Sequence, residues 1–214
     1  MNTHPKIKYL TKEEQESIGE AIHSDPRFGG KFPFEVELYL CSILGYDICP
    51  TDALEETCNV DTALIACKKL IRIQESTYNR NEARTRMSLA HELAHLVLHS
   101  EYIDHICALL RKANKTDEYN RIIRFLPEPD ATRAEEQAFF TAGAIVAPKS
   151  ILKREIVGFI SSKVQLGTAL KDGDVILLFK HLTGFFGITQ SALVKRLDMS
   201  GLEWITRCPR QASY

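Results

Sequence analysis

The polar and apolar positions at the start of the chain predict two helices with a break between them. Thr11 and Glu14 form a capping-box pattern, and the mostly polar segment after them predicts a peripheral helix up to Ser24. A proline and a pair of glycines then interrupt any helix. Residues 34–44 are rich in apolar side chains and predict a buried helix that ends at Gly45.

The next segment has the pattern of a small sheet. Two short apolar runs, residues 63–67 and 70–73, are separated by a pair of lysines and predict a β-hairpin. Residues 54–60 are a candidate for one more strand. We therefore expect a small sheet between the first helices and the rest of the chain.

The middle of the chain is predicted to be helical again. We expect a helix over residues 83–100, a polar connector over 101–130, and a helix over 132–146 that ends before Pro148. Helices, a small sheet and further helices in this order predict the α+β fold class.

Residues 150–214 are predicted to form a helical C-terminal region in short pieces, with breaks near Gly167 and residues 172–174. Residues 186–197 have the rhythm of a helix-turn-helix, in which a glycine turn and a threonine cap join two helices. This pattern leaves DNA binding open as a function. A small helical lobe that packs on the rest of the chain is the simpler interpretation, because a single turn pattern is a weak signal.

The composition is that of an ordinary globular protein. Of the 214 residues, 44% are hydrophobic and 26% charged, which excludes a largely disordered chain, a collagen-like repeat and a disulfide-held miniature domain. Lys and Arg number 27 against 28 Asp and Glu. The formal charge of -1 leaves no overall positive field for nucleic acid or an anionic membrane surface.

Cysteine usage and the first residues predict a cytoplasmic protein. The six cysteines are scattered, without a C-x-x-C pair, and most lie among apolar residues, so we interpret them as small buried side chains. The first residues are not followed by the apolar segment of a signal peptide. The uncharged run at residues 137–148 is too short to span a bilayer, so we expect no membrane segment.

One short motif carries the candidate chemistry. His91, Glu92 and His95 form an H-E-x-x-H pattern inside the predicted helix. Residues four apart lie on one helix face, so both imidazoles can bind one Zn²⁺. Glu92 lies about 100° around the helix from His91, where its carboxylate can act as a general base on water without binding the metal. A random order of these residues would contain about 0.02 such motifs.

Apolar residues are expected on the opposite side of this helix. Leu89, Leu93, Leu96 and Val97 form a stripe that would pack on the core while the histidines face a cleft. The alternative is a buried helix whose histidines only form hydrogen bonds.

A catalytic zinc takes three protein ligands and keeps one position open. His99 continues the four-residue spacing, but a straight helix places it about 12 Å beyond His91, so one ion cannot easily bind all three histidines. Glu101, Asp104 and His105 follow the helix and are better explained as solvated connector residues.

Glu135 is the preferred third ligand. It shares a helix face with Ala138, Phe139 and Ala142, and a carboxylate on such a face is costly to bury unless it binds a cation or meets an opposite charge. The alternative explanation is a carboxylate favoured by the dipole at the start of the helix. Glu136 projects about 100° away, toward solvent or an arginine.

Two further roles are left to groups of candidates. His99, Ser88 and Glu136 are the candidates for residues that support the ligands without binding the metal. The group that would stabilise the oxyanion of a peptidase reaction stays open among His99, Tyr102, Tyr119 and Arg86.

The motif segments resemble one known family. Residues 84–99 read R-x-R-x-S-L-A-H-E-L-A-H-L-x-L-H, and residues 135–148 hold Glu-x-x-Ala and an apolar helix that closes in Pro. Both resemble the ImmA/IrrE family of gluzincin-like H-E-x-x-H zinc metallopeptidases, and residues 178–201 are more weakly similar to its C-terminal helical segment. Residues 141–148 depart from the Phe-Ala-Ala-x-Leu-Leu-Met-Pro that the family prefers, and the preceding connector is long for the family.

The resemblance implies a zincin-like metallopeptidase domain over residues 1–149 and a mostly helical region, helix-turn-helix-like in part, over residues 150–214. The site residues that it implies are the zinc ligands His91, His95 and Glu135 and the catalytic carboxylate Glu92. It also implies a regulatory endopeptidase that cleaves one protein, such as a helix-turn-helix transcriptional repressor of a mobile element or a stress response.

Two features of the sequence bear on this expected function. The predicted hairpin offers an edge strand with which an extended substrate segment can pair. The alternative is a DNA-binding or toxin-antitoxin-type interaction protein with a non-catalytic metal site. Structural zinc sites usually have four ligands rich in cysteine, and the cysteine spacing here does not match one.

Overall fold

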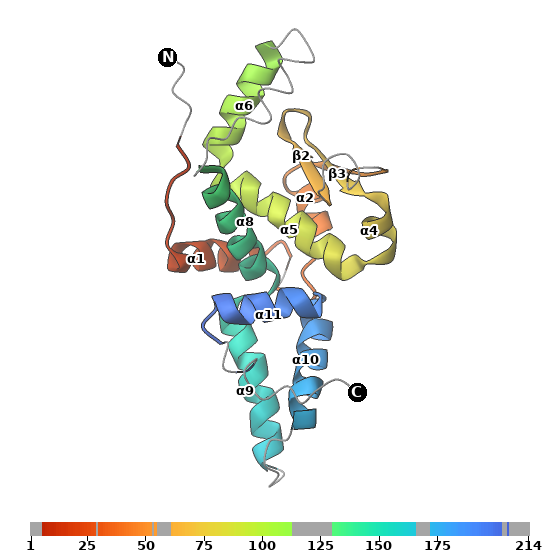
Figure 1. Ribbon diagram of the computed structural model, residues 1–214, viewed down its shortest axis with the longest axis vertical. Helices are drawn as coiled ribbons and strands as arrows, with labels where there is room; N and C mark the ends of the chain where they lie inside the picture. The colour runs from red at the N-terminus through yellow and green to blue at the C-terminus, as the bar shows by residue number, and fades with distance from the viewer. Residues whose placement is uncertain are drawn as a thin grey trace.

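Two long helices, α5 and α8, form the centre of the fold, and α1 packs against α8 (Figure 1). The computed structural model describes residues 6–28, 30–52, 54, 61–112, 130–165, 172–202 and 205. Helices α9 and α10 run antiparallel at the end of the molecule opposite α6, and α11 lies across between them and the α5–α8 pair (Figure 1). The elements in chain order are α1 (Lys12–His23), α2 (Val36–Ser42), β1 (Asp47–Thr51), β2 (Thr62–Ile65), η1 (Ala66–Lys68), β3 (Leu70–Gln74), α4 (Glu75–Arg80), α5 (Glu82–Leu98), α6 (Ser100–Lys112), α8 (Asp130–Val146), α9 (Lys149–Gln165), α10 (Asp172–Phe186) and α11 (Gln190–Met199).

The helices predicted from the sequence are confirmed. Helix α1 begins with the expected capping box, in which the Glu14 backbone N–H donates to Thr11 Oγ1 and the Thr11 N–H donates to the Glu14 carboxylate. Helices α5 and α8 match their predicted ranges within two residues at each end, whereas α2 is shorter than the predicted range of residues 34–44. The polar connector contains a helix of its own, α6, and residues 113–129 lie outside the described part of the chain.

The sheet has three strands in the order β1-β3-β2. Strands β2 and β3 form the predicted antiparallel hairpin, with Lys69 in the left-handed conformation at the turn. Strand β1 pairs parallel with β3 and was not predicted, because its side chains are mostly exposed and Pro50 interrupts any apolar alternation. Of the candidate strand at residues 54–60, Leu54 is not in a strand and the rest lies outside the described residues.

The apolar back of α5 is confirmed in part. Leu89 and Leu93 are fully buried in the core, and Leu96 is partly buried against it. The prediction for Val97 was wrong, because this side chain is 41% exposed. At about 100° per residue, Val97 lies roughly 80° around the helix from Leu89, whereas Leu96 lies only about 20° away.

The expectation of buried cysteines was wrong for two of them. Cys41, on α2, and Cys49, on the edge strand β1, are exposed, whereas Cys107 on α6 is buried. Apolar neighbours in the sequence point to other faces of the same helix or strand, so they do not bury the cysteine between them. Cys58 and Cys208 lie outside the described residues.

The C-terminal region is helical, as predicted. Residues 172–174 begin α10 and do not break a helix, and the predicted break at Gly167 lies outside the described residues. The turn between α10 and α11 has the predicted chemistry. Gly187 has a φ of 60°, which glycine adopts without strain, and Thr189 Oγ1 accepts a hydrogen bond from the Ala192 N–H.

Two buried arginines attach α11 and the turn before it to the rest of the protein. Arg196 Nε donates to the Ala147 carbonyl at 2.8 Å, and its guanidinium pairs with Glu16 of α1. Arg86 of α5 donates to the carbonyl of Gly187. Because both arginines are more than nine-tenths buried, these bonds hold α11 firmly against α5 and α8.

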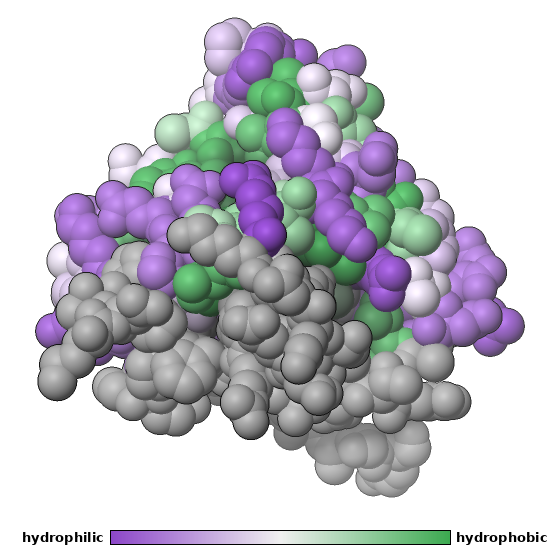
Figure 2. All heavy atoms as spheres, turned by 90° about the horizontal axis from the view of Figure 1, so that it is seen from above, coloured by the Kyte–Doolittle hydropathy of each residue, from purple (hydrophilic) through white to green (hydrophobic). Residues whose placement is uncertain are grey.

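None of the described helices combines the length and apolar character needed to cross a membrane. Seen from the α6 end of the molecule, hydrophilic and hydrophobic residues are interspersed on the described part of the surface (Figure 2).

Helices α1 and α8 approach so closely at Gly19 that no side chain fits there. A Cβ at this position would lie 2.4 Å from the Cβ of Ala144 and 2.8 Å from its carbonyl carbon. Because backbone atoms cannot rotate away, we expect Gly19→Ala to lower the free energy of unfolding by about 1–3 kcal/mol.

Urea denaturation of Gly19→Ala and of Gly158→Ala provides the measurement and its control. Gly158 is also in a helix, but a Cβ there meets nothing within 4 Å, so we expect that variant to gain about 0.5–1 kcal/mol. Equal stability of the two variants would contradict the close approach of α1 and α8.

Candidate metal centre

The two histidines of the H-E-x-x-H motif face one point in space. Asn81 precedes helix α5, and its side-chain oxygen accepts the Arg84 N–H and caps the helix. One helical turn separates His91 from His95, and their Nε2 atoms lie 3.0 Å apart. At this distance the lone pairs of two unprotonated ring nitrogens would repel each other, so a proton or a cation must lie between the nitrogens.

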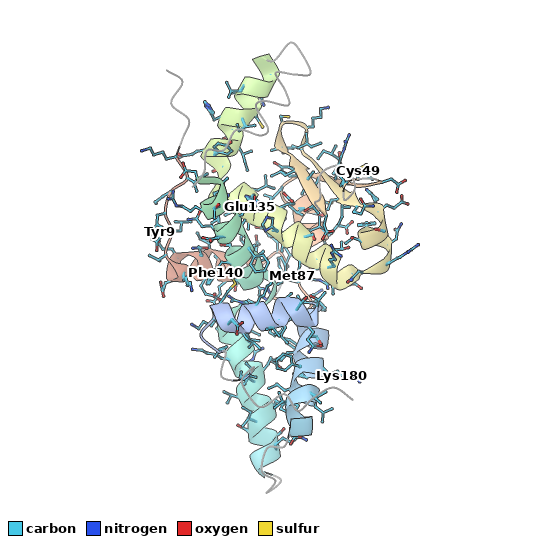
Figure 3. All side chains as sticks on the ribbon, viewed as in Figure 1. Tyr9, Cys49, Met87, Glu135, Phe140 and Lys180 are labelled. Carbon is cyan, nitrogen blue, oxygen red and sulfur yellow. The ribbon has the colours of Figure 1, made fainter. Side chains whose placement is uncertain are left out.

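Glu135, near the start of α8, closes the group. Its Oε2 lies 3.0 Å from His91 Nε2, and its Oε1 lies 3.5 Å from His95 Nε2. The three residues each offer one ligand atom, and these atoms lie within 4.8 Å of one another, so the group can hold a metal ion. The preference for Glu135 over the other candidates is thus supported by its position (Figure 3).

The reason given for choosing Glu135 was only partly correct. The expectation was a carboxylate on an otherwise buried apolar face, but the side chain of Glu135 is 65% exposed. Ala138 and Ala142 on the same face are fully buried, whereas Glu135 lies at the open end of this face beside α5 (Figure 3). Glu136 is exposed and does not line the cavity around the ligands.

The charges of the group are complementary. Hydrogen bonds from His91 and His95 hold the pKa of the Glu135 carboxyl far below its usual range. Burial lowers the pKa of His91, but the hydrogen bond to Glu135 and the charges of Glu92 and Glu135 outweigh it, and the pKa is raised. The site therefore favours positive charge between the imidazoles, as a cation-binding site does.

His99 lies behind His95 and not among the ligand atoms. Its Nδ1 is 3.0 Å from His95 Nδ1, and its Nε2 is 3.1 Å from Gln137 Oε1. The Gln137 amide is oriented by its second bond, in which Nε2 donates to the Lys8 carbonyl at 2.9 Å. Burial above all lowers the pKa of His99 to about 4, so the ring is neutral at physiological pH.

This chain of bonds fixes the tautomers of both rings. Because Gln137 Oε1 can only accept, His99 carries its hydrogen on Nε2 and accepts at Nδ1. His95 in its neutral form then donates from its own Nδ1 and directs the lone pair of Nε2 at His91 and Glu135, and its Nε2 donates to Glu135 only when the ring is protonated. A fixed ring of this kind is the usual support behind a metal-binding histidine.

Glu92 is held beside the ligands without joining them. The residue is 6% exposed, and Oε1 of its carboxylate accepts a hydrogen bond of 2.6 Å from Thr62 Oγ1 on strand β2. Thr62 was missed by the sequence analysis because nothing in a threonine of a short strand marks it as part of a site. Gln137 was also missed, because nothing in the sequence around it marks it as part of a site.

A cavity of about 570 Å³ opens over the group. Its walls come from strand β2 and from helices α5, α8 and α11, and Ser88 lines it, while a supporting role of Ser88 toward the ligands stays a prediction. Met87 lies on α5 between Glu135 and α11 in the view of Figure 3. The cavity therefore extends from the histidines toward the C-terminal helices.

The remaining candidates lie elsewhere. Glu101, Asp104 and His105 are on α6 and, among the described residues, do not belong to the ligand group. Arg86 is buried and bonds to the Phe34 and Gly187 carbonyls, so it does not face the cavity as an oxyanion stabiliser. Tyr102 lines a separate hollow behind His95, and Tyr119 lies outside the described residues.

Comparisons with known proteins found no match to this chain among family models, curated proteins or solved structures. The likeness to the ImmA/IrrE metallopeptidases therefore rests on the motif segments alone.

Removing His99 tests the support of the ligands. We expect His99→Ala and Gln137→Leu each to weaken Zn²⁺ binding by about 10- to 100-fold, because the His95 ring loses its fixed tautomer. His91→Ala should abolish stoichiometric binding. Competition titration with a fluorescent chelator measures all three.

His181→Ala is the matched control, because His181 is on α10 and bonds to Glu155, away from the ligand group. Its Zn²⁺ affinity should equal that of the unmodified chain. Unchanged affinity of His99→Ala would show that His99 packs beside the site without supporting it.

Proposed function

We propose that this protein is a zinc-dependent endopeptidase. The observation that carries the proposal is that His91, His95 and Glu135 offer three ligand atoms to one point while the carboxylate of Glu92 lies in the same cavity. Two imidazoles and one carboxylate with an open position are the ligand set of catalytic zinc in peptidases.

The spacing of the ligand atoms fits this ion. Zinc bonds of about 2.0–2.2 Å in a tetrahedral arrangement separate two ligand atoms by roughly 3.3 Å. The two Nε2 atoms lie 3.0 Å apart, and Glu135 places Oε2 at 3.0 Å from His91 Nε2 and its other oxygen, Oε1, at 3.5 Å from His95 Nε2. A structural zinc site would need a fourth protein ligand, and none is found with these three among the described residues.

Bound Zn²⁺ would supply Lewis acidity, which acidifies water and polarises the carbonyl of the scissile peptide bond. The chain's own residues do the rest. Thr62 holds Oε1 of Glu92, so Oε2 is the atom left to take a proton from the attacking water. The same carboxylic acid then gives the proton to the leaving amine, which completes hydrolysis with Glu92 restored.

Strand β2 is suited to hold the substrate in an extended form. Among the described strands it pairs only with β3, along one edge, and Thr62, Ala63 and Leu64 line the cavity. A peptide that adds to the other edge would lie across the ligand group and receive backbone hydrogen bonds. This supports an endopeptidase that acts on an extended segment of a protein chain.

The resemblance to ImmA/IrrE proteins supports a regulatory role, with a helix-turn-helix repressor as the substrate. The competing function, DNA binding by α10 and α11, is less favoured. In a helix-turn-helix the first residues of the second helix contact bases. Here Thr189, Ser191 and Ala192 at the start of α11 line the cavity instead.

Replacing Glu92 separates metal binding from chemistry. We expect Glu92→Gln to bind Zn²⁺ with unchanged stoichiometry and to lose about 10²- to 10⁴-fold in cleavage rate, because an amide cannot take the proton. Mass spectrometry of a proteome-derived peptide library incubated with zinc-loaded protein gives the rates. Cleavage that survives the substitution would exclude Glu92 as the base.

Replacing Thr62 tests the orientation of this base. Thr62→Val keeps the shape but removes the donor, and we expect kcat to fall by about 10- to 100-fold with KM little changed. Thr62→Ser keeps the hydroxyl and should retain most of the activity. Equal losses in the two variants would point to packing of β2 and not to the hydrogen bond.

A further inference from the structure

The cavity has a second end, which the chemistry of the metal centre does not use. This end is bounded by α11 and by apolar side chains of α5 and α8, with Met87, Phe139 and Ala142 forming part of its lining. Phe139 follows Glu135 by one helical turn, a rise of about 6 Å. An extended peptide advances about 3.3 Å per residue, so this end lies within one or two residues of the scissile bond.

One cation dominates this end of the cavity. Lys195 of α11 lines it, with its Nζ 5.0 Å from the centre of the Phe139 ring. No carboxylate of the described residues lies within ion-pair distance of that ammonium group. Contact with a ring face leaves N–H donors of the ammonium free for an anion.

The other polar groups around this end are already engaged. Arg84 binds both oxygens of Asp61, at 2.6 and 2.7 Å. The hydroxyls of Thr189 and Ser191 lie 3.0 Å from each other, and Thr189 also caps α11. Lys195 is therefore the charged group best placed to meet a ligand at this wall.

The wall that carries Lys195 is fixed in place. The adjacent residue, Arg196, projects about 100° away into the core, where it binds Glu16 and the Ala147 carbonyl. The turn before α11 is bound by Arg86. The separation between Lys195 and the ligand group is thus set by buried bonds, as a selective subsite requires.

We propose that this end of the cavity is a subsite for an acidic side chain of the bound peptide, an inference that rests on the proposed peptidase function for its place in the substrate. The methylene groups of a glutamate or aspartate would contact Phe139 and Ala142, and its carboxylate would pair with Lys195 Nζ. The protein therefore selects segments with an acidic residue next to or one position from the cleaved bond.

Peptide selection without turnover tests the subsite. Zinc-loaded Glu92→Gln protein is incubated with a library of short N-acetylated, C-amidated peptides with randomised positions, and the retained peptides are sequenced. We expect acidic residues to be enriched about threefold to tenfold at one position. Adding Lys195→Gln should abolish this enrichment, and adding Lys195→Glu should replace it with enrichment of Lys and Arg.

Lys180→Gln is the matched control. Lys180 is an exposed lysine of α10, drawn well away from the cavity in Figure 3, and it does not line the cavity. Its substitution should leave the acidic enrichment intact. Absence of acidic enrichment, or the same enrichment with and without Lys195, would overturn the subsite.

Cleavage of the same library by the unmodified zinc-loaded protein tells the two proposals apart. Acidic enrichment that depends on Lys195, without cleavage by the unmodified protein, would support the subsite and refute the peptidase. Cleavage that shows no preference for an acidic residue near the cut bond would support the peptidase and refute the subsite.

Discussion

The close packing of α5 on α8 is the constraint on which the candidate site depends. Each ligand follows directly after a buried alanine: Ala90 before His91, Ala94 before His95, and Ala134 before Glu135. The three alanines are buried, at 0%, 0% and 2% exposure. Each ligand side chain points about 100° away from the buried alanine before it, and His91 and His95 are half-buried while Glu135 is exposed, so the three meet where the buried faces of the helices end.

Other parts of the fold complete what the two helices begin. Strand β2 brings Thr62 to the carboxylate of Glu92, and the N-terminal segment offers the Lys8 carbonyl to Gln137. These contacts orient side chains that would otherwise rotate freely. They also bury polar groups, each of which then needs a hydrogen-bond partner. Oriented side chains of this kind are what a group that can hold a metal ion requires.

The C-terminal helices belong to the same arrangement. Side chains of α9, α10 and α11 join the core formed by α2, α5 and the sheet, and α11 forms a wall of the cavity. The buried Arg196–Glu16 pair joins the last described helix to the first. A helix pair with a helix-turn-helix rhythm thus forms part of the cavity wall, because the same turn chemistry suits any two helices that meet at an angle.

The sequence by itself determined the elements whose signals are local. Capping of α1 by Thr11, the hairpin around Lys69 and the shared face of His91 and His95 depend on neighbours a few residues apart, and all three are present. Periodicity also selected Glu135 from several acids, although the stated reason, burial, does not hold for its exposed side chain. Only the tertiary structure decided the rest. The strand β1, the bond from Thr62 to Glu92, the Gln137–His99–His95 chain and the place of Lys195 join residues far apart in the sequence. Their side chains have no periodic pattern that would pair them, so their meeting follows only from the way in which the sheet, α8 and α11 pack around α5.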